Sequence, residues 1–251
     1  MDISIASYSF HGLLDAGMID VFGYLESCKY RYHLQSADIW NGMLPSTSED
    51  YLKKVKTALV ERELVLANLC VDDAHIWEDD PVLREKNYQN ALAHLRAGEY
   101  LGARTIRIDA GVEGDMFTNE QFDWIVKRFK EYAQRTFDLG YMVGPENHWG
   151  AEKIPENMKR LCEAVDHPGF GVLLHFRGND GDALMAPWAM HTHISWDIAH
   201  TCLEDSMRML RQAGYQGYWG VEHHSGKNEY INTAIQLCRV QQVLACSAWQ
   251  V

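Results

Sequence analysis

The sequence lacks the short patterns that mark several common classes of protein. None of its six cysteines forms a C-x-x-C pair, which excludes a zinc knuckle and a thioredoxin-type redox site. The formal net charge is -12 and no run is rich in lysine or arginine, so we expect no nucleic acid partner. The opening "MDISIASYSFHG" has neither a basic region nor a long apolar run. We therefore expect no signal peptide, no membrane span and a cytoplasmic location.

The composition is that of a folded domain with a sizeable core. Hydrophobic residues make up 47% of the chain and charged residues 23%. The length of 251 residues is usual for one α/β barrel, so we expect a single domain over residues 1–251. The widely scattered cysteines are typical of reduced and mostly buried thiols. They are Cys28, Cys70, Cys162, Cys202, Cys238 and Cys246.

Short apolar runs alternate with longer segments of helical periodicity. The runs predict strands at 3–8, 36–40, 64–71, 103–109, 141–146, 170–175, 189–195 and 218–223. Helices are predicted at 48–63, 80–102, 118–140, 154–165, 202–214 and 228–246. Pro81 and Thr118 suit the starts of two of these helices, and Gly102 and Gly140 suit their ends. Alternating strands and helices imply parallel strands, and eight such units close into a (β/α)8 TIM barrel.

A doubly wound open sheet is the alternative architecture. The segment 176–187, "FRGNDGDALMAP", is short and rich in glycine for a crossover helix. However, no G-x-G-x-x-G pattern follows the first predicted strand, which argues against a dinucleotide-binding sheet.

Polar side chains occupy the ends of the predicted strands, where the active sites of such barrels lie. The last four runs supply Glu146 and His148, then His175, then His191 and His193, and finally Glu222. A buried carboxylate is costly unless it is paired or bound to a metal ion. Two glutamates and two histidines suit Mn²⁺, Zn²⁺, Fe²⁺ or Co²⁺ better than Mg²⁺ or Ca²⁺. The sequence therefore predicts a divalent metal site formed by side chains from four strands.

Three motifs make the chain similar to the sugar phosphate isomerase/epimerase superfamily, the xylose-isomerase-like TIM barrels. "ENHWG" at 146–150 resembles E-N-H-x-G, "HTHISWD" at 191–197 resembles H-x-H-x-K-D, and "GYQGYWGVEHH" at 214–224 resembles G-Y-x-G-x-x-x-x-E. The resemblance implies that Glu146, position 175, His193 and Glu222 hold the metal. His175 replaces the usual aspartate of the family, which removes one negative charge, and Ser195 replaces the lysine.

The resemblance implies an isomerase or epimerase acting on a carbohydrate or polyol-like small molecule. A metal would stabilise the negative charge that develops after proton abstraction next to a carbonyl. Glu146 and Glu222 are the expected acid and base. We expect Arg107 or Arg177 to bind a carboxylate or phosphate, His148 and His191 to bind hydroxyls, and Trp40 and Trp149 to stack on a sugar ring.

Other functions are compatible with the same residues. A metal-dependent lyase or dehydratase, including one that cleaves C-glycosides, would use the same proton abstraction. A non-catalytic barrel that binds a ligand is the alternative from a different class. Relatives of the endonuclease IV type are disfavoured by the charge of -12. The sequence leaves the oligomeric state open, including a homo-oligomer.

Overall fold

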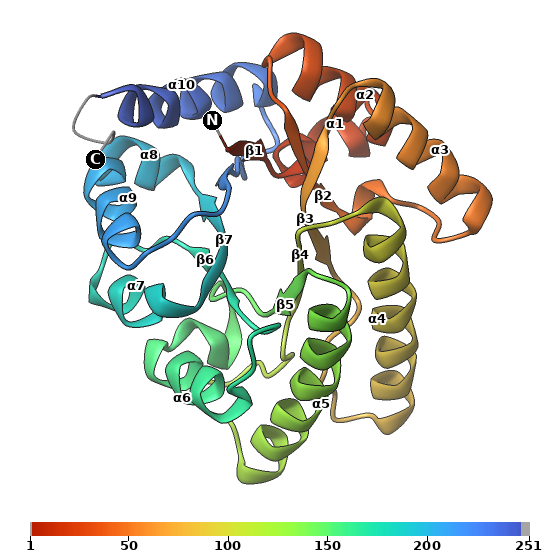
Figure 1. The fold of residues 1–251 in the computed structure, drawn as a ribbon, viewed down its shortest axis with the longest axis vertical. Helices are drawn as coiled ribbons and strands as arrows, with labels where there is room; N and C mark the ends of the chain where they lie inside the picture. The colour runs from red at the N-terminus through yellow and green to blue at the C-terminus, as the bar shows by residue number, and fades with distance from the viewer. Residues whose placement is uncertain (1, 247–251) are drawn as a thin grey trace.

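The chain forms a barrel of parallel strands with helices on its outer side (Figure 1). The computed structural model describes residues 2–246. The strands are β1 (Ile3–Ile5), β2 (Ser36–Trp40), β3 (Val65–Val71), β4 (Thr105–Ile108), β5 (Met142–Gly144), β6 (Val172–His175), β7 (Ala189–Ile194) and β8 (Trp219–Val221). Each lies within its predicted run, so the predicted (β/α)8 TIM barrel is confirmed and the doubly wound sheet is wrong.

The barrel closes along two seams. Its strands pair in two parallel sheets, ordered β1-β8-β7-β6 and β2-β3-β4-β5. Single bridges between Ala6 and Asp38 and between Val143 and Phe170 join the two sheets. At the second seam, a Cβ atom on Gly144 would lie 1.7 Å from the carbonyl oxygen of Gly171. The absence of a side chain at Gly144 therefore allows the backbones of β5 and β6 to approach.

The helices follow the strands around the barrel. They are α1 (His11–Asp15), α2 (Val21–Glu26), α3 (Glu49–Glu61), α4 (Pro81–Leu101), α5 (Asn119–Asp138), α6 (Pro155–Val165), α7 (Asp180–Met185), α8 (Trp196–Thr201), α9 (Leu203–Gln212) and α10 (Glu229–Ala245). Short 3₁₀ or π turns occupy Ser7–Phe10, Ser27–Arg31, Asn41–Met43, Gly150–Lys153 and Ala186–Trp188. The six predicted helices are confirmed, but α1, α2 and α8 were not predicted. The glycine-rich segment forms only the short α7.

Two helix ends show why the local sequence was informative. Thr118 accepts a hydrogen bond from the backbone N–H of Gln121, and the Gln121 side chain accepts one from the N–H of Thr118. This reciprocal capping starts α5. Gly102 adopts a left-handed φ of 84° just past α4, a conformation that favours glycine. Both boundaries follow from the side chains present at these positions.

The apolar core and the polar interior lie on opposite sides of the strands. Ile106 of β4 faces α4 close to Gly98, and Phe129 of α5 packs on Phe170 with ring centroids 5.0 Å apart. Inside the barrel, Asn68 donates a hydrogen bond to Asp38 and accepts one from Thr105. The alternation of side chains along a strand produces these two environments. Polar groups therefore form the floor beneath the ends of the strands.

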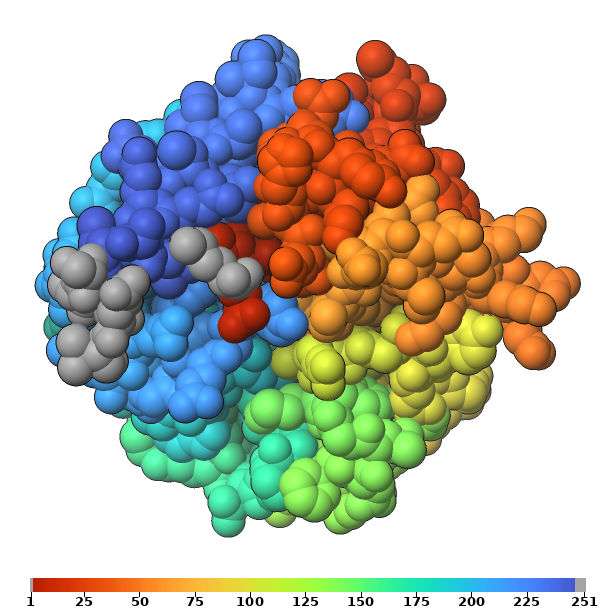
Figure 2. Space-filling model, turned by 45° about the horizontal axis from the view of Figure 1, so that its top comes forward, coloured from red at the N-terminus to blue at the C-terminus, as the bar shows by residue number. Residues whose placement is uncertain are grey.

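The first and last parts of the chain lie together. Glu229, in the first turn of α10, accepts hydrogen bonds from the backbone N–H groups of Gly12 and Leu13 at 2.8 and 2.9 Å. The space-filling view shows the blue C-terminal segments beside the red N-terminal ones (Figure 2). These contacts hold α1, which follows β1, against the start of α10, which follows β8.

Cysteine burial differs in part from the expectation. Cys28, Cys70 and Cys162 are buried, Cys202 is half-buried, and Cys238 and Cys246 are exposed. Among residues 2–246, no helix combines the length and apolar character needed to cross a membrane.

Candidate metal centre and active site

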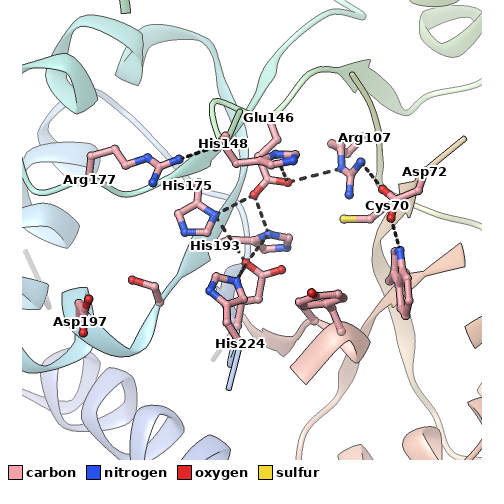
Figure 3. Close-up of a pocket in the computed structure, with 15 residues that line it drawn as sticks. Cys70, Asp72, Arg107, Glu146, His148, His175, Arg177, His193, Asp197 and His224 are labelled. Atoms are coloured by element: carbon pink, nitrogen blue, oxygen red, sulfur yellow. Dashed lines mark hydrogen bonds and ion pairs between the residues drawn. The ribbon is translucent and has the colours of Figure 1, made fainter. Parts of the chain in front are cut away.

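Four side chains from consecutive strands or their following loops converge at one end of the barrel. Nδ1 of His175 lies 2.9 Å from a carboxylate oxygen of Glu146 and 3.5 Å from one of Glu222. Nδ1 of His193 lies 3.1 and 3.4 Å from the same two carboxylates. All four side chains are buried, and Figure 3 shows Glu146, His175 and His193 pointing toward a common centre. The structure thus brings together the four residues named as metal ligands from the sequence.

Asp38 of β2 fixes the orientation of two of the histidines. One oxygen of its carboxylate lies 2.8 Å from Nε2 of His191 and 3.1 Å from Nε2 of His193. Its other oxygen accepts a hydrogen bond from Asn68 at 3.0 Å. When Nε2 of His193 donates to Asp38, Nδ1 of the same ring is left as the nitrogen that can bind a metal ion. A carboxylate behind a ligating imidazole is a common arrangement in metal sites.

Two further imidazoles contact the glutamates, His148 at the second oxygen of Glu146 and His224 at the same oxygen of Glu222 that faces His175 and His193. Nδ1 of His148 lies 3.1 Å from Glu146, and Nε2 of His224 lies 2.8 Å from Glu222. The ring of His224 also stacks on that of His175, with centroids 5.6 Å apart. Each glutamate therefore contacts both inner histidines and one outer histidine.

The electrostatics of the cluster keep the two carboxylates ionised. Burial alone would raise the pKa of Glu146, but the imidazoles of His148 and His193 hold that pKa well below its usual range. Burial likewise opposes ionisation of Glu222, and His193 and His224 lower its pKa. Conversely, burial disfavours the charged form of His193, yet the carboxylates of Glu222 and Glu146 raise its pKa well above the ordinary value. When no cation is bound, the imidazoles and the two carboxylates of the cluster are therefore expected to share protons through their hydrogen bonds.

The donor atoms of the cluster fit a divalent metal ion. One ligand atom from each of Glu146, His175, His193 and Glu222 lies within 4.8 Å of all the others. Two imidazole nitrogens and two carboxylate oxygens suit Mn²⁺, Fe²⁺, Co²⁺ or Zn²⁺. A metal ion bound to these atoms would replace the shared protons and offset the two buried negative charges.

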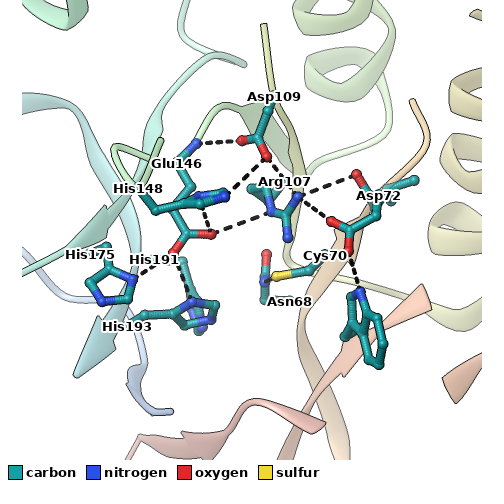
Figure 4. Close-up of polar contacts among 12 residues, drawn as sticks. Asn68, Cys70, Asp72, Arg107, Asp109, Glu146, His148, His175, His191 and His193 are labelled. Carbon is teal, nitrogen blue, oxygen red and sulfur yellow. Dashed lines mark hydrogen bonds and ion pairs between the residues drawn. The ribbon is translucent and has the colours of Figure 1, made fainter. Parts of the chain in front are cut away.

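A buried arginine supports Glu146 from the other side. Nη1 of Arg107 lies 2.8 Å from Asp72 and 2.7 Å from Asp109, and its Nε lies 3.4 Å from Glu146 (Figure 4). Asp109 in turn accepts a hydrogen bond from the backbone N–H of Glu146 at 3.0 Å. Burial opposes the charge of Arg107, but Asp109 and its other partners raise its pKa well above the ordinary value. This network holds Glu146 in place.

The cluster opens into a cavity of about 530 Å³. Tyr8 and Trp40 form part of its wall and meet edge to face, with centroids 5.1 Å apart. The indole N–H of Trp40 donates to Asp72 at 2.5 Å. The remaining lining residues are Ala6, Cys70, Arg107, His148, Arg177, Ser195, Asp197 and His224, besides the four candidate ligands and Asp72. The volume suits a small-molecule substrate.

Two residues expected to contact substrate lie outside this cavity. His191 is fully buried below it and faces Asp38, so its side chain is part of the support for the site. Trp149 lies against His75, with ring centroids 4.9 Å apart, and lines a separate pocket. In contrast, Trp40, Arg107, His148 and Arg177 all line the central cavity.

The sequence reasoning did not identify Asp38, Asp72, Tyr8, Cys70 or Asp197 as part of the site. Asp38 could have been identified from the sequence, because it interrupts the apolar run "SADIW" of a buried strand. A charged side chain there is costly unless it is paired. Of the others, Cys70 lies in β3, Asp72 directly follows β3, Tyr8 lies in the turn Ser7–Phe10 and Asp197 lies in α8, so no shared sequence signal marks them.

The fold and the site together define a class, a parallel barrel with a candidate divalent metal centre at the carboxyl ends of its strands. The family model "Xylose isomerase-like TIM barrel" matches residues 33–194. The chain therefore belongs to the xylose isomerase-like TIM barrel family, which confirms the resemblance recognised from its motifs. No curated protein matches the sequence significantly.

Solved structures of low sequence identity share the whole fold. D-psicose 3-epimerase with D-tagatose from Clostridium cellulolyticum H10 superposes with a TM-score of 0.78 at 14% identity, covering 98% of this chain and 100% of that one. A xylose isomerase-like TIM barrel protein from Mycobacterium smegmatis in complex with magnesium gives 0.76 at 16% identity, covering 99% and 97%. The probable 3-DHS dehydratase AsbF from Bacillus anthracis gives 0.74 at 15%, covering 96% and 99%.

Proposed function

We propose that the protein is a divalent-metal-dependent isomerase or epimerase that acts on a sugar or polyol-like substrate. One observation carries this proposal. Glu146, His175, His193 and Glu222 converge from four neighbouring strands, with ligand atoms within 4.8 Å of one another, beside a cavity of about 530 Å³. Such a buried set of two carboxylates and two imidazoles needs a cation or shared protons to offset its charge.

The residues of the cavity have distinct roles in this reaction. Glu146 and Glu222 hold the metal and carry protons to and from carbon on either face of the substrate. When bound, the metal supplies stabilisation for negative charge on the substrate oxygens. His148 and His224 lie against these two carboxylates and are placed to donate hydrogen bonds to hydroxyl groups. Trp40 and Tyr8 provide an aromatic wall for the carbon chain.

The structural neighbours support this choice of reaction. The neighbour from Clostridium cellulolyticum H10 is a D-psicose 3-epimerase that was solved with D-tagatose. The neighbour from Mycobacterium smegmatis was solved with magnesium. At 14% and 16% identity these similarities concern the fold, so the argument for this chain depends on its own cluster.

Solvent exchange tests the proposed reaction directly. A base that removes a carbon-bound proton exchanges it with solvent. We expect the Mn²⁺- or Co²⁺-loaded protein, incubated in deuterium oxide with a panel of ketoses and keto acids, to introduce deuterium next to the carbonyl of its substrate. Mass spectrometry measures the incorporation, and protein treated with a chelator is the control. Product formation without any exchange would instead favour a hydride shift, with both glutamates acting as ligands only.

A metal-dependent lyase or dehydratase is the second candidate. The same proton abstraction gives elimination when the substrate has a leaving group next to the carbanion. Burial opposes the charged form of His148, but Glu146 and Asp109 raise its pKa, so it is a candidate acid for such a leaving group. AsbF, whose structure superposes on this one, is itself described as a probable dehydratase. Loss of water or of an aglycone from keto-glycosides or hydroxy keto acids, followed by mass spectrometry, distinguishes elimination from isomerisation.

A complete lack of reaction would favour the non-catalytic alternative. If the metal-loaded protein neither exchanges protons nor eliminates a group from any compound in the panel, a ligand-binding barrel becomes the better description. Calorimetric binding of the same compounds would then identify the ligand.

A further inference from the structure

The two arginines of the cavity differ in how their charges are compensated. The guanidinium of Arg107 is buried and lies within 3.4 Å of three carboxylates, those of Asp72, Asp109 and Glu146. Arg177 lines the same cavity on the side of β6 (Figure 3). Over residues 2–246, the structure has no carboxylate oxygen within 4.0 Å of a side-chain nitrogen of Arg177. Three carboxylates of the protein therefore compensate the charge of Arg107, although its hydrogen bonds all come from Nη1. No carboxylate compensates the charge of Arg177 in this way.

Backbone groups hold the guanidinium of Arg177 in place. Its Nη2 donates hydrogen bonds to the carbonyl oxygens of Asn147 and His148, at 3.1 and 2.9 Å. These two residues belong to the loop that carries Glu146. The anchoring uses one nitrogen of the guanidinium and leaves Nη1 and Nε for another partner. A pair of N–H donors in fixed geometry is well suited to a carboxylate or a phosphate.

The loop that carries Arg177 is also fixed. The buried carboxylate of Asp182 accepts hydrogen bonds from the backbone N–H of Arg177 at 2.9 Å and from that of Gly178 at 2.7 Å. Gly178 has a left-handed φ of 70°, and a Cβ atom there would lie 2.7 Å from the sulfur of Cys202. The short turn after β6 is thus held on both sides, which limits how far Arg177 can move.

The titratable groups around Arg177 include Asp182, whose carboxylate binds the backbone N–H of Arg177. The others are the candidate metal ligand His175, two residues before it, His148, and Asp197 in α8. Asp197 also lines the cavity, but it is too far from Arg177 to form an ion pair. Figure 3 shows the two side chains apart from each other. An anion bound to Arg177 would face no carboxylate within ion-pair reach of that guanidinium.

We propose that Arg177 binds an oxyanion of the substrate, so that the substrate class is an acidic sugar, with a carboxylate or phosphate group on its carbon chain. This inference rests on the proposed function of the same cavity. It also distinguishes between the two arginines considered from the sequence, because Arg107 already has its anionic partners. The oxyanion lies toward β6, and the aromatic wall of Trp40 is on the side of the cavity near Arg107.

Direct binding measurements test this proposal without turnover. The probes are inorganic phosphate, D-glucuronate and neutral D-glucose, titrated calorimetrically into Mn²⁺-loaded protein. We expect at least one of the two anions to bind more tightly than glucose, and the tighter anion identifies the group. Arg177→Gln should weaken that binding by about 10-fold or more, whereas Arg177→Lys should retain part of it because the charge remains. Arg208→Gln, on the outer surface of α9, is the matched control and should bind like the parent.

Two results would overturn the inference. One is anion binding by Arg177→Gln that equals the parent's, which would place the anion on the metal or elsewhere. The other is glucose binding as tightly as both anions. Proton exchange with D-fructose and D-fructose 6-phosphate distinguishes failure of the anion site from failure of the proposed isomerase function. Exchange of the neutral sugar at an equal rate, unaffected by Arg177→Gln, would keep the isomerase and reject the anion site. Anion binding that depends on Arg177, without exchange of any sugar, would keep the site and reject the isomerase.

Discussion

The carboxylate of Asp38 lies 3.1 Å from Nε2 of His193, and Nδ1 of the same ring lies 3.1 Å from Glu146. The imidazole therefore connects a carboxylate on β2 with the candidate metal centre on the opposite side of the barrel. Because the side chain of Asp38 is fully buried, it has no competing solvent contact. Asp38 thus contacts His193 and does not line the central cavity.

Replacing Asp38 should weaken metal binding without removing a ligand. We expect Asp38→Asn to reduce affinity for Mn²⁺ or Co²⁺ by roughly 10–100-fold, the usual effect of losing such a partner. Nitrogen-15 NMR of the metal-free protein, at a pH high enough for the His193 imidazole to be neutral, should show a larger share of its Nδ1–H tautomer in this variant. Unchanged tautomer and unchanged affinity would show that Asp38 only fills space. The stability of the variant, measured by urea unfolding, separates loss of fold from loss of orientation.

Glu222 should be required for the metal itself. Protein purified without chelator should hold about one transition metal ion per chain, and Glu222→Gln should hold much less, since an amide replaces a charged ligand. Inductively coupled plasma mass spectrometry gives the ratio. Glu113→Gln, which changes an exposed loop residue, is the control. Equal metal content in the parent and in Glu222→Gln would remove Glu222 from the site.

His175 offers a test of the unusual ligand in this chain. His175→Asp restores the residue that the resemblance implies and should retain the metal, because an aspartate oxygen can take the place of the imidazole nitrogen. His175→Ala should lose affinity, since Nδ1 of His175 faces both glutamates. Calorimetric titration with Co²⁺ compares the two variants. If His175→Ala binds as well as the parent, the imidazole supports the site without ligating.

Glu146 should contribute to turnover as well as to metal binding. Glu146→Gln keeps an oxygen and the shape of the side chain but cannot accept a proton. With metal supplied in excess, we expect turnover to fall by on the order of 10²–10⁴-fold, the usual contribution of a general acid or base. Deuterium incorporation by the variant, measured by mass spectrometry, should fall in parallel. Turnover close to that of the parent would assign proton transfer to another group.

The fold was predictable because its signals are local. Eight apolar runs of strand length recur along the chain, and residues such as Thr118 and Gly102 mark helix boundaries by their own chemistry. The region between β1 and β2 was harder, because it is divided among α1, α2 and two short turns rather than one periodic helix. Its structure depends on tertiary contacts such as those of Glu229 with Gly12 and Leu13.

The candidate ligands were predictable because each lies at or just beyond the end of a strand, and parallel strands bring their carboxyl ends together. The supporting residues were not, because their partners come from distant positions in the sequence. Asp38 and His191 are 153 residues apart, and the alternation of side chains alone could not show that His191 lies below the cavity. Likewise, Trp149 follows His148 directly but lines a different pocket.

The buried carboxyl group of Glu152 should make stability depend on pH. Burial raises its pKa well above the usual range, and the nearby charge of Asp109 adds to this effect. One oxygen accepts a hydrogen bond from the backbone N–H of Ala110 at 2.8 Å. Because the folded state favours the protonated acid, the stabilising contribution is complete below the pKa of the unfolded chain, about 4.3, and is lost as the pH rises through the higher folded-state pKa.

The variant Glu152→Gln removes this titration and keeps an oxygen for Ala110. We expect its free energy of unfolding, relative to that of the parent, to increase between about pH 5 and pH 8, because only the parent has to maintain a protonated carboxyl group as the pH rises. Urea unfolding at several pH values measures the difference between the two proteins, so that titrations common to both cancel. A difference that stays constant over this range would mean that Glu152 is already ionised when buried, with Arg107 or another partner supplying the compensating charge.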